Sequence, residues 1–221
     1  MTNGDSPQSP TEARILPWTP RKRPPPGGAS EAKPPPYAEL QIATGFSFLY
    51  GASHAQELVE TAVALGLSAI GIADRNTVAG VVRAHEAAKE AGLRLLVGSR
   101  LYFRDGTPDV LCYPQDRAAW SRLTRLLTTG NLRGKKGECL LDYADLHAHG
   151  EGQILLVAPP DRLNAAFCEN VQRIATDLPG SLYLAASRRY RSDDTRRLQL
   201  LACLGDAAGA PMVATNDVLY H

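Results

Sequence analysis

The sequence predicts an α/β fold in which parallel strands form a sheet or a barrel and helices cover the strands. Short apolar segments alternate with longer amphipathic segments from Tyr37 to the end of the chain, which is the pattern of a repeated β–α unit. The 221 residues suffice for one large core or barrel and are too few for several full domains. Residues 1–36 are rich in proline, so we expect a disordered tail there and one barrel domain over residues 37–221.

The first elements follow from local patterns. An apolar run at residues 37–43 predicts a strand. A helix follows, because Ser53 is a suitable N-cap residue and apolar residues recur on one face as far as Leu65. The run SAIGIA at residues 68–73 predicts a buried strand, and residues 78–92 form a helical pattern that ends on a glycine.

The central elements include a tight turn. Residues 93–103 predict a strand, and the pair Asp105–Gly106 turns the chain toward a further strand at residues 109–113. A helix over residues 116–130 follows, with Asp116 as its cap.

The last third of the chain continues the alternation. A basic, glycine-rich loop at residues 130–139 leads to a short helix at residues 141–150. The remaining predicted elements are strands at residues 153–158, 181–188 and 211–217 and helices at residues 161–178 and 193–209.

Composition excludes several classes of protein. The net charge of +1 gives no global preference for nucleic acid or membrane. The four cysteines show no CxxC spacing, which argues against a zinc knuckle or a redox motif. No apolar run is long enough to span a membrane, and the polar N-terminus does not resemble a signal peptide, so we expect a cytoplasmic protein.

In folds of this class, ligands bind beyond the carboxyl ends of the parallel strands. We therefore expect ligand-binding residues in the segments that follow each predicted strand. These segments are residues 41–45, 74–76, 99–100, 158, 187–189 and 216–221.

Two stretches carry a family resemblance. YAELQIATGFSFLYG opens residues 37–101, and PMVATNDVLYH covers residues 211–221. Both are similar to the N-terminal PHP (polymerase and histidinol phosphatase) domain of bacterial C-family DNA polymerases, in particular the error-prone polymerases related to the replicative alpha subunit. The resemblance implies a distorted seven-stranded β/α barrel, and we expect it to be incomplete at the C-terminus.

The resemblance also implies a place for metal chemistry. Active members of the family bind several metal ions at the carboxyl ends of the strands and hydrolyse phosphoesters. Their ligand motifs are a His-x-His, an Asp-His pair, a glutamate and an Asp-x-His. In this chain those positions hold Gln41, Ala43, Asp74, Arg75, Arg100, Asp217 and Leu219.

These residues predict a degenerate metal site. Ala43 has no donor atom, and Arg75 and Arg100 place fixed positive charges where cations would bind. We therefore expect no metal-binding, catalytic or cofactor-binding residues, and we predict that Asp74 and Asp217 form ion pairs with the two arginines.

The resulting prediction is a structural PHP domain of an error-prone DNA polymerase that acts in DNA replication and repair. The expected partners are the polymerase core of the same protein, DNA through the full-length enzyme, and accessory proteins of mutagenic repair. Magnesium is expected only in the polymerase core, which these residues do not resemble, so the chain alone should not polymerise DNA. Two alternatives stay open: a metal-dependent phosphoesterase or 3′-5′ exonuclease with an altered ligand set, and a free-standing binding module.

Overall fold

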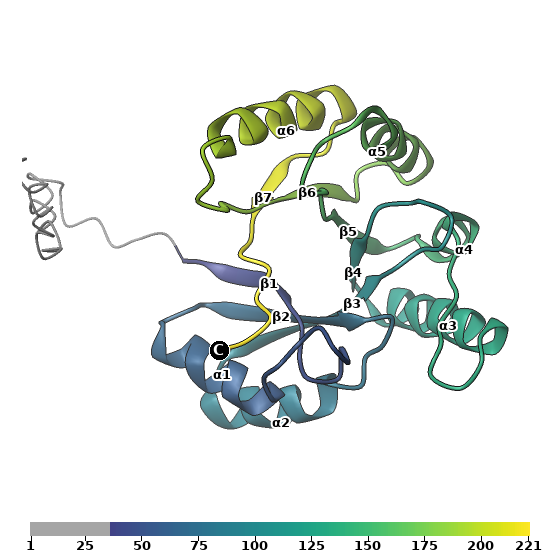
Figure 1. Cartoon of the computed structure of the whole chain (residues 1–221). Helices are drawn as coiled ribbons and strands as arrows, with labels where there is room; N and C mark the ends of the chain where they lie inside the picture. Colours follow the sequence, from purple (N-terminus) through teal and green to yellow (C-terminus); the bar gives the residue numbers. More distant parts are fainter. Residues whose placement is uncertain (1–35) are drawn as a thin grey trace, which may run out of the picture. The chain divides into compact units, whose positions relative to one another are not determined.

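Seven apolar segments form one sheet in the computed structural model, which describes residues 36–221 (Figure 1). The strands are β1 (Ala38–Ile42), β2 (Ala69–Arg75), β3 (Arg94–Leu101), β4 (Val110–Pro114), β5 (Gln153–Val157), β6 (Leu182–Ala186) and β7 (Met212–Ala214). The helices are α1 (Ala55–Ala64), α2 (Val81–Ala91), α3 (Arg117–Arg133), α4 (Tyr143–His149), α5 (Ala165–Asp177) and α6 (Asp194–Ala208). The predicted seven-stranded β/α barrel is confirmed. The predicted tail at residues 1–36 lies, except for its last residue, outside the described part of the chain.

The strands are neighbours in chain order, and all adjacent pairs are parallel except those that involve β4. The connection from β3 to β4 turns at Asp105–Gly106, where Gly106 has a positive φ of 86°. A connection this short reverses the chain, because a parallel pair needs a long crossover. The start of β4 therefore lies at the same end of the barrel as the end of β3, and this determines which side chains meet there.

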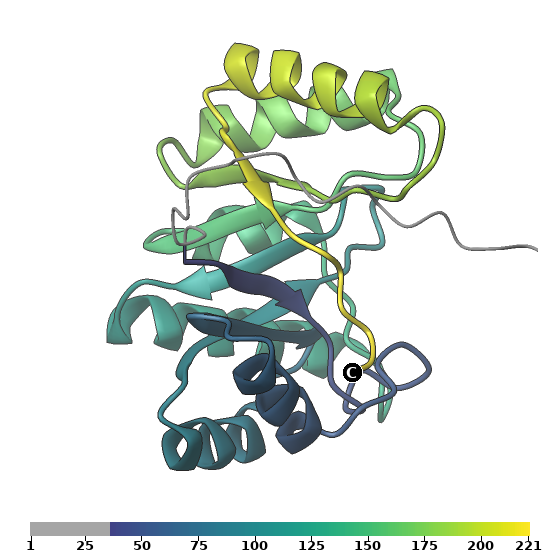
Figure 2. The ribbon, with the colours of Figure 1, turned by 90° about the vertical axis from the view of Figure 1, so that its left-hand side faces the viewer.

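The segment after β7 closes the barrel against β1. Val218 donates its N–H to the carbonyl of Gln41 (2.7 Å), and its own carbonyl accepts from the N–H of Ala43 (3.0 Å). Residues 216–219, here called the seam, run beside β1 in the side view of Figure 2. Buried Glu39 reinforces the seam by accepting the N–H of Asn216 at 2.9 Å.

The barrel interior is small because one tyrosine fills it. Tyr113 of β4 packs with Leu111, and its hydroxyl donates to the carbonyl of Leu40. A Cβ atom at Gly71 or Gly98 would come within 2.7 or 2.6 Å of the Tyr113 side chain. Glycine on β2 and β3 therefore makes room for this ring.

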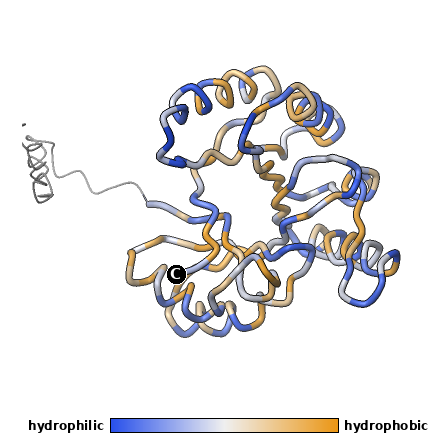
Figure 3. Tube along the Cα trace, in the orientation of Figure 1, coloured by the Kyte–Doolittle hydropathy of each residue, from blue (hydrophilic) through white to orange (hydrophobic). Residues whose placement is uncertain are grey.

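Two apolar layers lie between the strands and the surrounding helices. One joins β1 and β2 to α1 and α2, and the other joins β3, β4, β5 and β6 to α3, α4, α5 and α6. Figure 3 shows the apolar strands at the centre and polar residues on the outer helices. Of the helices in residues 36–221, none is both long enough and apolar enough to cross a membrane.

Some helix ends differ from the prediction. Asp116 caps α3 as predicted, accepting the N–H of Ala119 at 2.7 Å. Helix α1 begins after His54 rather than Ser53, because Glu57 accepts the N–H of His54 at 2.7 Å. Helix α3 continues through Gly130, whose missing side chain allows Cys139 to pack closely against the helix.

Candidate functional site

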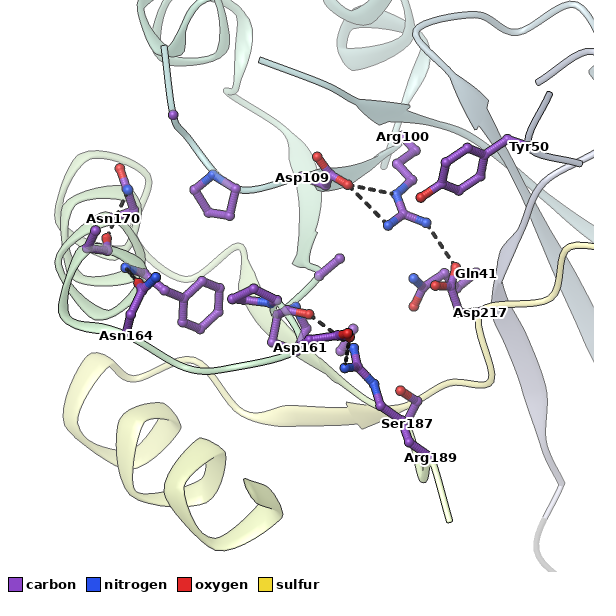
Figure 4. A pocket seen from close by; sticks show the side chains of 18 residues that line it. Gln41, Tyr50, Arg100, Asp109, Asp161, Asn164, Asn170, Ser187, Arg189 and Asp217 are labelled. Atoms are coloured by element: carbon purple, nitrogen blue, oxygen red, sulfur yellow. Dashed lines mark hydrogen bonds and ion pairs between the residues drawn. The ribbon is translucent and has the colours of Figure 1, made fainter. Parts of the chain in front are cut away.

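A cavity of about 430 Å³ lies at the end of the barrel where the parallel strands finish. Its walls come from the ends of β1, β3 and β6, from the start of β4, and from the segments after β5 and β7. Figure 4 shows its polar side chains, which include Gln41, Arg100, Asp109, Ser187 and Asp217. This is the position at which the sequence predicted a ligand site.

Arg100 is the central charge of this cavity. It donates to Asp109 at 3.1 Å and to Asp217 at 2.9 Å, and its side chain is only 10% exposed (Figure 4). These three residues are here called the Arg100 clamp. The predicted pair between Arg100 and Asp217 is confirmed, while Asp109 was not predicted as a partner.

The antiparallel strand explains why Asp109 was missed. Asp109 precedes β4, so in an all-parallel sheet it would lie at the opposite end of the barrel from Arg100. Because β4 is reversed, Asp109 meets the end of β3 instead. The turn residues Asp105–Gly106 were the only sequence signal for this reversal.

Burial and charge act in opposite directions on the clamp. Burial by itself would lower the pKa of Arg100, but the charges of Asp217 and Asp109 outweigh it and raise that pKa above the usual arginine value. Burial raises the pKa of Asp109, and the Arg100 charge offsets this rise only in part. The arginine therefore stays charged at every physiological pH and is held between two acids.

Asp74 does not form the predicted ion pair. It is fully buried and accepts hydrogen bonds from the Thr44 N–H (2.8 Å), the Thr44 hydroxyl (2.9 Å) and the Ser47 hydroxyl (2.7 Å). This prediction was wrong because the loop after β1 folds over the carboxylate and supplies neutral donors, which stabilise its charge. Ser47 also accepts the N–H of Arg75 at 3.0 Å, so Asp74 organises this loop.

Arg75 also differs from the prediction, because it contacts aromatic rings rather than an acid. Its guanidinium carbon lies 3.9 Å from the centre of the Tyr102 ring and 5.9 Å from that of Tyr50. The two rings meet edge to face at 6.1 Å. Such stacking suits a guanidinium that needs no carboxylate partner.

The other predicted positions hold the barrel together. Buried Gln41 accepts the Thr215 hydroxyl at 3.0 Å, and Leu219 accepts the Ala52 N–H through its carbonyl at 2.8 Å. Ala43 donates its N–H to the seam. These contacts use backbone and amide groups and bring no metal-binding side chains together.

The donors do not fit the multinuclear metal centre that the fold implies. Across residues 36–221, no three side chains of His, Cys, Asp or Glu converge closely enough to hold an ion. The three acids of the cavity already face guanidinium groups: Asp109 and Asp217 pair with Arg100, and Asp161 pairs with Arg189. Divalent ions of phosphoesterases need several converging carboxylate or imidazole ligands, and this cavity lacks them.

Comparison with known proteins gives a family match and close relatives. The sequence matches the PHP domain family over residues 39–179. It is 59% identical over 189 residues to an error-prone DNA polymerase of Caulobacter vibrioides and 53% identical over 194 residues to one of Rhodopseudomonas palustris. Each alignment covers 86% of this chain but only 18% of the relative. The chain thus spans under a fifth of the length of these relatives.

Solved structures show the same fold at low sequence identity. A putative metal-dependent phosphoesterase from Bifidobacterium adolescentis aligns with a TM-score of 0.63 and 19% identity, over 84% of this chain and 88% of that one. An amidohydrolase from Chromobacterium violaceum aligns with a TM-score of 0.57 and 14% identity, over 83% of this chain and 87% of that one. At these identities the likeness concerns the fold alone.

Proposed function

Because the chain belongs to the PHP domain family, we propose that it forms the N-terminal PHP domain of an error-prone DNA polymerase and acts there as a structural domain without metal chemistry. The names and identities of its relatives support the polymerase assignment. DNA synthesis itself would take place in a separate polymerase core that binds magnesium.

The Arg100 clamp is the observation that carries the structural role. In an active barrel, metal cations neutralise converging acids at the carboxyl ends of the strands. Here Arg100 joins Asp109, at the start of β4, to Asp217, in the seam. A covalently attached cation therefore holds the mouth of the barrel together, and it cannot activate water as a metal ion does.

The proposed setting follows from the family. The domain would pack against the polymerase core of the same protein, contact DNA through the full-length enzyme, and work with accessory proteins of mutagenic repair in the cytoplasm. Reading the gene beyond the codon for His221 tests this setting. A polymerase core in frame supports the proposal, whereas a stop codon would make the chain a free-standing binding module.

Metal analysis tests the structural role. The purified chain is dialysed first against Zn²⁺ or Mn²⁺ and then against metal-free buffer, and its metal content and melting temperature are measured with and without EDTA. We expect far less than one ion per chain and an unchanged melting temperature, because the cavity lacks converging ligands.

The opposite result would support the phosphoesterase or exonuclease alternative. One ion or more per chain, together with a melting temperature that falls on chelation, would contradict the proposal. Manganese-dependent release of nucleotides from a single-stranded 3′ end would then be the activity to measure.

A further inference from the structure

Arg197 of α6 is a buried cation with few partners. Only 6% of the residue is exposed, and it lies on the helix face that also buries Leu201 and Leu204. Its Nη1 donates to the carbonyl of Ser187 at 3.3 Å. Its Nε and Nη2 have no hydrogen-bond partner anywhere in residues 36–221. A buried guanidinium with two unsatisfied nitrogens is costly, which suggests that a partner is missing.

Nearby acids do not supply that partner. No carboxylate in the described part of the chain lies within ion-pair distance of Arg197. Asp161 already pairs with Arg189, and its Oδ2 lies 3.7 Å from Nη1 of Arg191. Burial, followed by the positive charge of Arg189, lowers the pKa of Arg197. Asp194, Asp161 and Asp193 act in the opposite direction on this pKa, but burial and Arg189 outweigh them, so the charge of Arg197 is only partly compensated.

Arg197 lines a pocket of about 340 Å³ between α6 and the loop that precedes α5. Arg162 and Arg196 line the same pocket; both are exposed, and neither forms an ion pair within residues 36–221. Asp161 and Asp193 also line it. Three arginines therefore line one concave space, and guanidinium groups are suited to donate hydrogen bonds to the oxygens of a phosphate group.

An exposed aromatic ring lies in the adjoining loop. Tyr190 is 91% exposed and stands between Arg189 and Arg191 in the chain. Exposed tyrosine beside arginine is typical of surfaces that stack nucleic-acid bases while cations hold the backbone. A flexible single strand can direct one phosphate into a concave pocket and place a base on a ring, whereas a duplex offers its phosphates on a rigid convex surface.

We propose that the pocket formed by Arg162, Arg196 and Arg197, here called the arginine pocket, binds a backbone phosphate of single-stranded DNA, with Tyr190 stacking on an adjacent base. The phosphate chemistry follows from the structure, and the choice of DNA rests on the proposed function.

Fluorescence anisotropy of a labelled oligothymidylate with the 221-residue chain tests this site. We expect Arg162→Gln combined with Arg196→Gln to weaken binding about tenfold or more. Each lost phosphate contact should also lower the slope of log affinity against log salt by about 0.7. Tyr190→Ser should weaken binding without changing that slope, because stacking releases no counterions. Arg94→Gln is the matched control: it removes one charge from the exposed start of β3, at the other end of the strands, and should leave affinity unchanged.

Arg197→Met separates binding from structure. Methionine has a similar length and carries no charge, so the melting temperature should stay equal or rise while DNA affinity falls. A variant that melts lower and binds DNA as the parent does would show that Arg197 has only a structural role and would overturn the proposal. Equal affinities for the parent and the double variant would also overturn it.

The source of the phosphate is tested by two further probes. Oligonucleotides with a 5′-hydroxyl and a 5′-phosphate should bind equally, because the site takes backbone diesters. Tighter binding of the 5′-phosphorylated oligonucleotide would mean that the pocket binds a terminal phosphate. Competition by millimolar inorganic phosphate would mean that it binds free phosphate. Either result would overturn the proposal that it binds the DNA backbone. None of these measurements depends on metal content, so failure here would leave the proposed structural role unaffected.

Discussion

At the scale of single residues, Arg100 is the residue that most changes the chemistry of this barrel. The family resemblance implies an acidic metal ligand at this position, whereas Arg100 joins Asp109 to Asp217. Arg75 has a different kind of partner, because its guanidinium stacks on the ring of Tyr102. Arg75 and Arg100 therefore have different partners, and only Arg100 neutralises carboxylates.

Replacing Arg100 should destabilise the fold. In Arg100→Ala, Asp109 and Asp217 would face each other without a cation. We expect the free energy of unfolding to fall by about 2 to 3 kcal/mol, less than for a fully buried pair because Asp217 is 41% exposed. Urea denaturation at pH 7 measures this. Arg104→Ala is the control, since its ion pair with Asp142 is exposed and should contribute much less. Equal effects of the two substitutions would contradict the role of the clamp.

At the scale of elements, the starts of two helices involve contacts with other elements, which helix propensity does not describe. Helix α2 begins after Gly80, where a Cβ atom would lie 2.4 Å from a carboxylate oxygen of Asp74 and 2.6 Å from the Thr44 hydroxyl. Helix α4 begins after Asp142, which forms a capping box with Asp145, and Arg133 of α3 holds the Asp145 carboxylate in place. Both starts depend on residues from other elements.

Gly80→Ala should destabilise the fold although alanine favours helices. The added methyl group would collide with the hydrogen-bonded loop around Asp74, so we expect a loss of about 1 to 3 kcal/mol in urea denaturation. Gly45→Ala is the control in the same region, because its Cβ atom would make an ordinary contact of 3.5 Å with the Ser53 carbonyl. A Gly80→Ala protein as stable as the parent would show that the loop yields to the added methyl.

Asp145 should make the stability sensitive to acid. Its hydrogen bonds from Arg133, which outweigh burial, lower the pKa of Asp145 below the usual value of 3.8. A lowered folded-state pKa means that the ionised form stabilises the fold above about pH 4, and that this contribution is lost as the pH falls through the lowered pKa. Asp145→Asn should therefore be less stable at pH 7 and lose less stability between pH 4 and pH 2. Urea midpoints across this range measure it, and parallel curves for the two proteins would contradict it.

At the scale of the whole molecule, the barrel has one weak join. Strands β2 and β3 pair along seven consecutive residues, whereas the seam meets β1 at the single bridge of Ile42 and Val218. Closure therefore rests on a few hydrogen bonds around Gln41, Ala43 and Val218, with Glu39 as support. Opening at the seam would separate Asp217 from the rest of the clamp.

Hydrogen exchange should reveal this join. The amides of Ala43 and Val218 should exchange faster than those of Ile72 and Val97 in the centre of the β2–β3 pair, because opening the seam breaks fewer contacts than unfolding the sheet. Mass spectrometry or NMR of the exchanging chain measures the difference. Equal protection at the four amides would mean that the seam opens only on global unfolding.

The sequence by itself determined the elements and their order. Apolar periodicity and helix signals such as Asp116 are local, so they predicted the seven strands and six helices with small errors at the ends. The polar positions after the strands also predicted where the cavity would lie. The Arg100–Asp217 pair could be predicted because Arg100 lies at the end of β3 and Asp217 follows β7, at the same side of the barrel.

Only the tertiary structure decided which groups neutralise one another there. Asp109 reaches Arg100 because β4 is antiparallel, and Asp74 is enclosed by hydroxyls because the loop after β1 folds back over it. The unsatisfied nitrogens of Arg197 could not be seen in its helical pattern either. The physical reason is common to all three. Charge pairing and burial depend on distances of a few ångströms between residues on different elements, whereas periodicity records only which face of an element is apolar.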